Sequence, residues 1–188
     1  MELFAIDPGN KESAYVLLNI ADSYDVKKGC FIYHPQSITL RRFGKESCWT
    51  VAEILENWLA SALHNEPRVV AIERVQAMGM PVGYEIFETC EWIGRYSQLC
   101  DLHCVAPQYV YRLEEKITLC NDSKAKDANI RQALIDRFAK HDFKNGKGTK
   151  ANPDVFYGFK ADIWAAMAVA TTCMDQLSGT GHKATWRR

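Results

Sequence analysis

Two short apolar runs, each closed by an acidic residue, constrain the fold of this chain more than any other feature. Leu3–Ile6 ends at Asp7, and Val69–Ile72 ends at Glu73. Unbroken runs of this length are typical of strands buried on both faces of a sheet. Between them, residues 50–64 carry apolar side chains at helical spacing, which predicts a crossover helix. The chain is therefore expected to contain parallel strands in an α/β fold.

The rest of the chain completes a mixed sheet covered by helices. Further strands are expected at Ser13–Ile20, at Cys30–Tyr33 with a continuation through Ser37–Leu40, and at Val105–Tyr111. Further helices are expected at Tyr84–Leu102, 124–141 and Asp162–Met174. The 188 residues suit one domain, here 1–177, and the glycine-containing basic end at 178–188 is expected to be a flexible tail.

Composition excludes several classes of protein. No run of 18 apolar residues exists, so a membrane span is not expected, and the N-terminus lacks the basic start of a secretory signal. A cytoplasmic protein is the default. Seven scattered cysteines do not suggest a disulfide framework. Cys100, His103 and Cys104 invite a zinc interpretation, but no second pair follows at finger-like spacing, so reduced buried thiols are favoured.

Charge is neutral overall but unevenly distributed. Residues 112–160 hold 11 basic and 7 acidic residues, whereas residues 1–66 are net acidic. This asymmetry favours a polyanionic partner for the second half of the chain, although a solvated lysine face would give the same pattern. The basic residues singled out in this half are Lys116, Lys124, Lys126, Arg131, Lys144, Lys147 and Lys150.

The acids that end the two apolar strands are candidates for a metal site. Parallel neighbouring strands would bring Asp7 and Glu73 to one edge of the sheet, where ligand sites of α/β folds gather. Two adjacent carboxylates favour a divalent cation between them, although each acid alone could be a strand-end cap.

A third acid, Asp162, precedes an apolar stripe at helical spacing, formed by Ala166, Val169, Ala170 and Cys173. The stripe should face the sheet and bring Asp162 to the other two acids, although an acid here also suits the helix dipole. Three convergent carboxylates would suit two Mg²⁺ ions about 4 Å apart, as in phosphodiester hydrolysis.

These residues resemble a known family. Ile6–Gly9, Ala71–Glu73 and Asp162–Ala170 look like the three acidic motifs of RuvC-type Holliday-junction resolvases. The stretch from Val105 to Arg131 is similar to that family's segment leading to a lysine-bearing helix. The loop Gly79–Gly83, with Phe87–Thr89 and Gly94-Arg95, looks most like phage-encoded branches. The resemblance covers most of residues 1–175.

The resemblance implies an RNase H-like fold with a five-stranded mixed sheet, in a nuclease domain over residues 1–177. It also implies a homodimer that nicks Holliday junctions or related branched DNA, in the cytoplasm of the cell or of a phage's host. Asp7, Glu73 and Asp162 fall on the family's catalytic metal ligands, which bind two Mg²⁺ ions, with Mn²⁺ as a substitute. The family's last motif usually carries a second acid, which is missing here; Asp127 and Asp154 are candidates to replace it.

DNA contacts are implied in the same way. Lys124 and Lys126 resemble the family's DNA-contacting lysines, although an ordinary basic helix start remains an alternative. Gln76 and Met78 lie in the loop where the family often carries a base-stacking side chain. Charge adds the further candidates Arg131, Lys144, Lys147 and Lys150. The helix at Tyr84–Leu102 carries more apolar residues than one buried face needs, so part of it is expected to form the dimer contact.

Two other functions compete with this interpretation. A strand ending in Asp-x-Gly also serves the phosphate loop of actin-like ATP-binding proteins, but Asn10-Lys11 and Glu73 fit that loop poorly. A non-catalytic relative that binds branched DNA is the second alternative, favoured by the missing fourth acid. ATP binding would identify the first alternative, and junction binding without cleavage the second.

Overall fold

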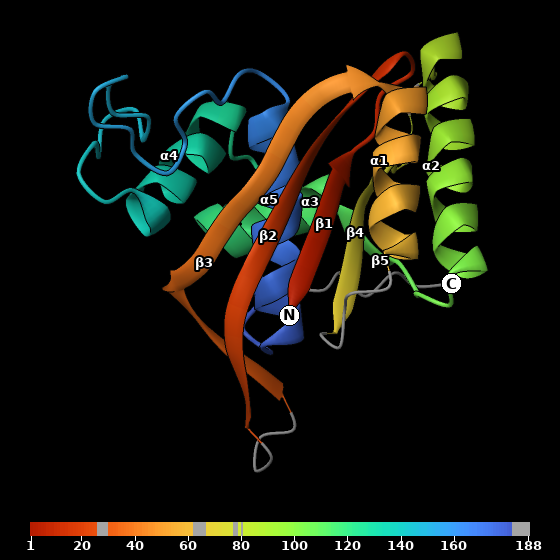
Figure 1. The fold of residues 1–188 in the computed structure, drawn as a ribbon. Helices are drawn as coiled ribbons and strands as arrows, with labels where there is room; N and C mark the ends of the chain where they lie inside the picture. The colour runs from red at the N-terminus through yellow and green to blue at the C-terminus, as the bar shows by residue number, and fades with distance from the viewer. Residues whose placement is uncertain (26–29, 62–66, 77–78, 80, 182–188) are drawn as a thin grey trace.

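Five strands form one mixed sheet in the order β3-β2-β1-β4-β5 (Figure 1). They are β1 (Glu2–Asp7), β2 (Glu12–Asp25), β3 (Cys30–Ser47), β4 (Arg68–Arg74) and β5 (Gln108–Tyr111). The first three strands are an antiparallel meander, whereas β4 and β5 run parallel to β1. This computed structural model describes residues 1–25, 30–61, 67–76, 79 and 81–181.

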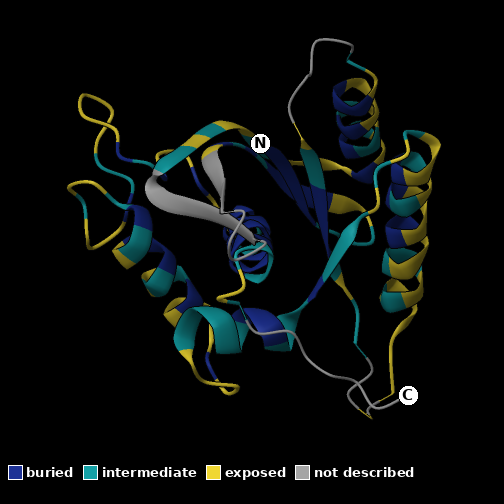
Figure 2. Cartoon of the chain, turned by 90° about the horizontal axis from the view of Figure 1, so that it is seen from below, coloured by how far each residue is buried: buried dark blue, intermediate teal, exposed yellow. Residues whose placement is uncertain are grey.

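Helices cover both faces of the sheet (Figures 1 and 2). They are α1 (Cys48–Ala60), α2 (Tyr84–Leu102), α3 (Arg112–Cys120), α4 (Asp127–Phe138) and α5 (Ile163–Leu177). The helices α1 and α2 pack on one face, and α5 lies across the other with α3 and α4 beside it. The α/β class, the antiparallel meander and the parallel pairing of β1 with β4 are confirmed.

Strict alternation along β1 divides the core into two layers. Phe4 and Ile6 pack with the side chains of α1 and α2, whereas Leu3 and Ala5 pack with those of α5. All four are fully buried. Because successive side chains of a strand point to opposite faces, Asp7 falls on the α5 face.

The same alternation on β4 places its terminal acid on the same face. Val70 and Ile72 belong to the layer under α1 and α2, whereas Ala71 belongs to the layer under α5. Glu73 therefore faces α5, as does Val110, its partner on β5. Two acids from strands far apart in sequence thus share one edge and one face of the sheet.

The helix α5 is the centre of the structure and is buried on nearly all sides. Ala166, Ala168 and Ala170 have no exposed surface, and such small side chains let the helix lie close to the sheet. Its far end is held by Asp175, which accepts two hydrogen bonds from Arg137 of α4, at 2.7 and 2.6 Å. The packing of α5 fixes the position of Asp162, the residue that precedes its first turn.

Several predicted elements differ in their bounds. The strand predicted at Ser13–Ile20 is Glu12–Asp25, the helix predicted at 50–64 is Cys48–Ala60, and the helix predicted at Asp162–Met174 is Ile163–Leu177. The strand β3 continues past Leu40 to Ser47. This extension was not predicted, because charged residues along the half-buried edge strand break the apolar run. The strand β5 begins only after Pro107, which cannot donate a ladder hydrogen bond. The helix α4 is three residues shorter at each end than expected. Beyond its C-terminal end, the Asp154 carboxylate accepts hydrogen bonds from the backbone N–H groups of residues 140–142, which holds them outside the helix.

The helix α3 was not expected from the sequence. Its buried residues are Glu114 and Glu115, so it has no apolar stripe that would indicate a helix. Its first turn is stabilised locally instead, since the Glu114 carboxylate accepts a hydrogen bond from the Tyr111 backbone N–H at 2.9 Å.

The cysteines, the lengths of the helices and the C-terminal tail were also subjects of predictions from the sequence. Cys48, Cys90, Cys100, Cys104, Cys120 and Cys173 form no disulfide, and burial raises the pKa of the Cys100 thiol to about 12. Cys100 is buried, as the thiol interpretation of this segment predicts, whereas Cys104 is exposed because it lies after the end of α2, so the prediction of a buried thiol is wrong for Cys104. No described helix is long and apolar enough to cross a membrane. Most of the expected tail, residues 182–188, lies outside the described residues.

Candidate metal centre and nucleic-acid interface

Asp7 and Glu73 lie side by side at the carboxyl ends of two parallel strands. The register that pairs Ile6 with Ile72 places the next residue of each strand, Asp7 and Glu73, in the same row. The two carboxyl groups are hydrogen-bonded to each other. The structure therefore brings this predicted pair of acids into direct contact.

Burial and the negative charges of its neighbours keep a proton on the Asp7 carboxyl group. Burial is the largest cause that raises the pKa of Asp7 to about 9, followed by the negative charge of Glu73 and the hydrogen bond between them. The charge of Asp162 raises the Asp7 pKa further, whereas Arg112 lowers it. At neutral pH Asp7 therefore keeps a proton, which a bound cation would displace.

Asp162 joins this edge of the sheet from the start of α5, where its side chain makes no capping hydrogen bond. Its carboxylate instead contacts the Lys45 ammonium at 2.8 Å, and Glu12 contacts the same ammonium at 3.1 Å. The ladder that pairs Asp7 with Ala14 also pairs Ala14 with Lys45, so Asp7 and Lys45 lie in one row across the sheet, two strands apart.

Lys45 is a site residue that the sequence analysis missed. The third strand was expected to end at Leu40, so the residues that follow were not assigned to the sheet. The alternation of Phe43 and Lys45 toward the α5 face was the available signal. Lys45 provides a positive charge to Asp162 at the edge where the acids gather.

The donor set has the chemistry of a site for a hard divalent cation. Asp7, Glu73 and Asp162 offer only carboxylate oxygens, the ligands that Mg²⁺ prefers. Among the described residues, no three acidic, histidine or cysteine side chains surround a single point. The reason lies in their present partners, because Asp7 and Glu73 are bonded to each other and Asp162 is bonded to Lys45.

The two acids proposed to complete the site have other partners. Asp127 begins α4, and its highly exposed carboxylate is ion-paired with Arg112. Asp154 is buried and accepts hydrogen bonds of 2.7 to 3.1 Å from the backbone N–H groups of residues 140, 141, 142 and 155. Although burial opposes it, these N–H groups hold the Asp154 pKa below its ordinary value. Asp154 therefore organises its loop, apart from the acid cluster.

A different acid, Glu115, faces the cluster from α3. Its side chain is fully buried, and burial and the charge of Glu73 raise its pKa well above the ordinary value, while Arg112 lowers it. The charge of Asp7 raises the Glu115 pKa as well. Glu115 was not predicted as a site residue, because α3 has no apolar stripe that would indicate a helix here.

A basic groove of about 640 Å³ extends from Asp162 along α4. Of the residues predicted to bind DNA, Arg131, Lys144 and Lys147 line it, and Lys160 is a further basic residue that was not predicted. The guanidinium of Arg131 lies 4.7 Å from the centre of the Trp164 ring, which holds it at the groove wall.

The remaining predicted DNA contacts lie outside this groove lining. Lys124 and Lys126 are exposed just before and at the start of α4, and Lys150 is exposed in the loop after Lys147. Gln76 is half-buried after β4. Met78 lies outside the described residues. The exposed lysines stay predictions, since an extended DNA could reach them without their lining the groove.

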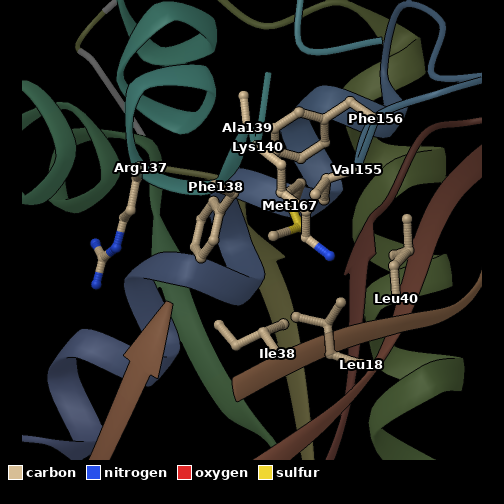
Figure 3. Close-up of a pocket in the computed structure, with 10 residues that line it drawn as sticks. All are labelled: Leu18, Ile38, Leu40, Arg137, Phe138, Ala139, Lys140, Val155, Phe156 and Met167. Carbon is tan, nitrogen blue, oxygen red and sulfur yellow. The ribbon is translucent and has the colours of Figure 1, made fainter. Parts of the chain in front are cut away.

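A second cavity, of about 300 Å³, lies on the same face of the sheet (Figure 3). Side chains of β2, β3, α4, α5 and the loop before α5 point into it, and most are apolar. Arg137 and Lys140 are the charged residues of its lining, which contains no acid. This cavity therefore lacks the oxygen donors of a metal centre.

The helix α2 divides its apolar residues between core and surface. Trp92, Ile93 and Tyr96 are buried against the sheet and belong to the core. Tyr84 and Phe87 are 72% and 59% exposed, and they remain available for a contact with another protein.

Comparison with known proteins identifies the fold. No family model and no curated protein matches the sequence. Two solved structures match nearly the whole chain: RuvC of Thermus thermophilus, with a TM-score of 0.62, and the same protein in complex with a Holliday junction substrate, with a TM-score of 0.60. Each is 14% identical and covers 96% of this chain and 98% of its own. The RNase H-like fold is thus confirmed, whereas the phage-like branch stays a prediction.

The proton on Asp7 makes the free energy of unfolding depend on pH. Because the Asp7 pKa is raised from 3.8 to about 9, the folded metal-free protein holds a proton that the unfolded chain releases between these values. Its free energy of unfolding should fall as pH rises through this range. Asp7→Asn should therefore be more stable than wild type in EDTA at pH 7, by about 1 to 4 kcal/mol.

Urea unfolding of both proteins from pH 5 to pH 8 measures this effect. The difference between them should grow with pH, whereas Asp136→Asn, at an exposed acid of α4, should follow wild type. Equal pH dependence of wild type and Asp7→Asn would show that Asp7 does not hold the proton.

The loop role of Asp154 gives a separate prediction. Asp154→Asn leaves one carbonyl oxygen where two carboxylate oxygens now accept backbone hydrogen bonds, so the loop around it should be destabilised by about 2 to 4 kcal/mol. The free energy of unfolding in urea measures this loss, and Mn²⁺ affinity should be unchanged at temperatures where the variant is folded. Weakened Mn²⁺ binding with normal stability would place Asp154 at the metal centre instead.

Proposed function

We propose that this protein is a divalent-metal-dependent endonuclease that nicks Holliday junctions or related branched DNA. The observation that carries the proposal is the meeting of Asp7, Glu73 and Asp162 at the carboxyl edge of the central strands. The acids come from three distant parts of the chain, and the contact between two of them raises the pKa of Asp7. A shared cation site explains that arrangement better than three separate strand or helix caps.

Two Mg²⁺ ions at this edge, with Mn²⁺ as a substitute, would activate a water and stabilise the leaving oxygen of a phosphodiester. Asp7, after releasing its proton, and Glu73 would hold them, with Asp162 as a third ligand. For this, Asp162 would leave Lys45, whose ammonium would keep its contact with Glu12. Arg112 adds positive charge next to Glu73.

The groove beside Asp162 supports a nucleic-acid substrate. Arg131, Lys144 and Lys147 line it, and the loop that bears the two lysines is held in shape by Asp142. The Asp142 carboxylate accepts hydrogen bonds from the backbone N–H groups of residues 145, 147 and 148. A fixed loop can present its lysines to DNA phosphates without first losing conformational freedom.

A homodimer is part of the proposal. A four-way junction offers two equivalent strands to cut, so a two-fold symmetric enzyme matches the symmetry of its substrate. The exposed Tyr84 and Phe87 of α2 are the apolar side chains best placed to join two copies. Such an enzyme would act in the cytoplasm, without a membrane.

A non-catalytic binding protein is the second candidate, favoured by the ion pair between Lys45 and Asp162. In that case the lysine would replace the metal for good. Junction binding without nicking, in either Mg²⁺ or Mn²⁺, would decide for this candidate.

The nuclease proposal predicts that Asp7→Asn, Glu73→Gln and Asp162→Asn each reduce nicking at least 100-fold, because each removes a charged metal ligand. Junction affinity should persist, since it depends on the basic groove. The assay is single-turnover cleavage of four-way, three-way, flap and linear DNA at saturating enzyme. Asp136→Asn is the matched control and should cleave like wild type. Near-normal nicking by Asp7→Asn would contradict the proposal.

The groove predicts a salt signature. Lys147→Ala should weaken binding to all junction sequences alike and reduce the slope of log K against log salt by about 0.9, the contribution of one phosphate contact. Lys140→Ala is the matched control, because Lys140 belongs to the lining of the apolar cavity. Fluorescence anisotropy from 50 to 200 mM salt measures both slopes. Equal slopes for the two variants would move the DNA path away from this groove.

A further inference from the structure

The inward face of α3 is unusual because its buried residues are glutamates. Of the two, Glu114 has a local role, since its carboxylate accepts the hydrogen bond from the Tyr111 backbone N–H. Glu115 has no such role at the helix end, yet its side chain has no exposed surface. A fully buried carboxylate is costly unless each oxygen has a partner, so its position calls for a chemical reason.

The topology places Glu115 beside the acid cluster. The parallel ladder pairs Glu73 with Val110 and Arg74 with Tyr111, and α3 begins at the next residue. The first turn of α3 therefore lies at the same carboxyl edge as Glu73. The negative charges of Glu73 and Asp7 both act on the Glu115 carboxylate at this edge.

Among the described residues, one of the two carboxylate oxygens of Glu115 has a hydrogen-bond partner and the other has none. Arg112 donates a hydrogen bond from Nη1 to Oε2 of Glu115, while its other terminal nitrogen contacts Asp127. The second oxygen, Oε1, is buried and has no hydrogen-bond partner among the described residues. A purely structural ion pair leaves this oxygen unexplained.

The balance of charges at this edge also favours a bound cation. The guanidinium of Arg112 is shared by Glu115 and Asp127 and also acts on Glu73 and Asp7. Lys45 is bound to Asp162 and Glu12. Carboxyl groups thus outnumber the cations that face them, so further positive charge at this edge would be stabilised.

We propose that Glu115 is the fourth carboxylate of the metal centre and binds a divalent cation, directly or through a cation-bound water, with its unpaired Oε1. It would supply the acid that the start of α5 lacks, where Phe159 and Ala165 stand three residues on either side of Asp162. Arg112 then has a positioning role, because it fixes one oxygen of Glu115 and leaves the other free. This inference rests on the proposed metal-dependent function.

Mn²⁺ binding to the full chain, without DNA, tests the inference apart from activity. Isothermal titration calorimetry should show that Glu115→Gln binds Mn²⁺ at least tenfold more weakly than wild type, or loses one bound ion. Asp175→Asn is the matched control, since Asp175 is also a buried carboxylate paired with an arginine, but at the far end of α5. It should bind Mn²⁺ like wild type. Asp7→Asn reports on the metal centre itself.

The outcomes separate the two proposals. If wild type does not bind Mn²⁺, or if Asp7→Asn binds like wild type, the metal centre fails and this inference fails with it. If Asp7→Asn loses Mn²⁺ but Glu115→Gln keeps full affinity, the centre stands and Glu115 is only the ion-pair partner of Arg112.

A folding defect would not hide the answer. Should circular dichroism show that Glu115→Gln is unfolded, Glu115→Asp keeps the charge but draws the carboxylate back by one methylene. The inference then predicts weaker Mn²⁺ binding, whereas unchanged binding would overturn it. Loss of folding in both variants would assign Glu115 a structural role and would also overturn the inference.

Discussion

The repulsion between the carboxyl groups of Asp7 and Glu73 is the interaction on which the rest of this edge of the molecule depends. Parallel pairing of β1 and β4 forces the two acids into one row, and burial denies them the screening of water. Nearby positive charges reduce that repulsion. Lys45 pairs with Asp162, and Arg112 pairs with Glu115 of α3 and Asp127 of α4. The proton on Asp7 removes one of the negative charges of the acid pair.

The scaffold keeps the acids together despite this cost. Buried apolar layers on both faces of the sheet fix the central strands, and the alanines of α5 let that helix lie close against β1. Asp162 cannot move far without displacing this buried helix. The basic groove begins beside it, so the fold that holds the acids also sets where a polyanion can approach. In this account, stability is given up at the edge of the sheet to maintain a cation site.

The sequence predicted those parts of the site that follow from apolar periodicity. Asp7 and Glu73 end unbroken apolar runs, and Asp162 precedes an amphipathic stripe, so their meeting could be predicted from strand and helix geometry. Lys45 and Glu115 could not be found in this way. Lys45 lies on a charged stretch of edge strand, and Glu115 on a helix whose buried face is acidic, so both are placed by tertiary structure against the usual pattern. The resemblance that suggested the fold rested on the same three acids, and it agrees with the observed sheet order.

Anomalous diffraction from crystals of the metal-free protein soaked in Mn²⁺ would test the central claim most directly. The account predicts strong anomalous density between the carboxylates of Asp7 and Glu73, with Asp162 turned from Lys45 toward the metal. Crystals of Asp7→Asn, soaked identically, should lack that density. Wild-type crystals with no manganese at this edge, and with Asp162 still bound to Lys45 at saturating Mn²⁺, would contradict the account.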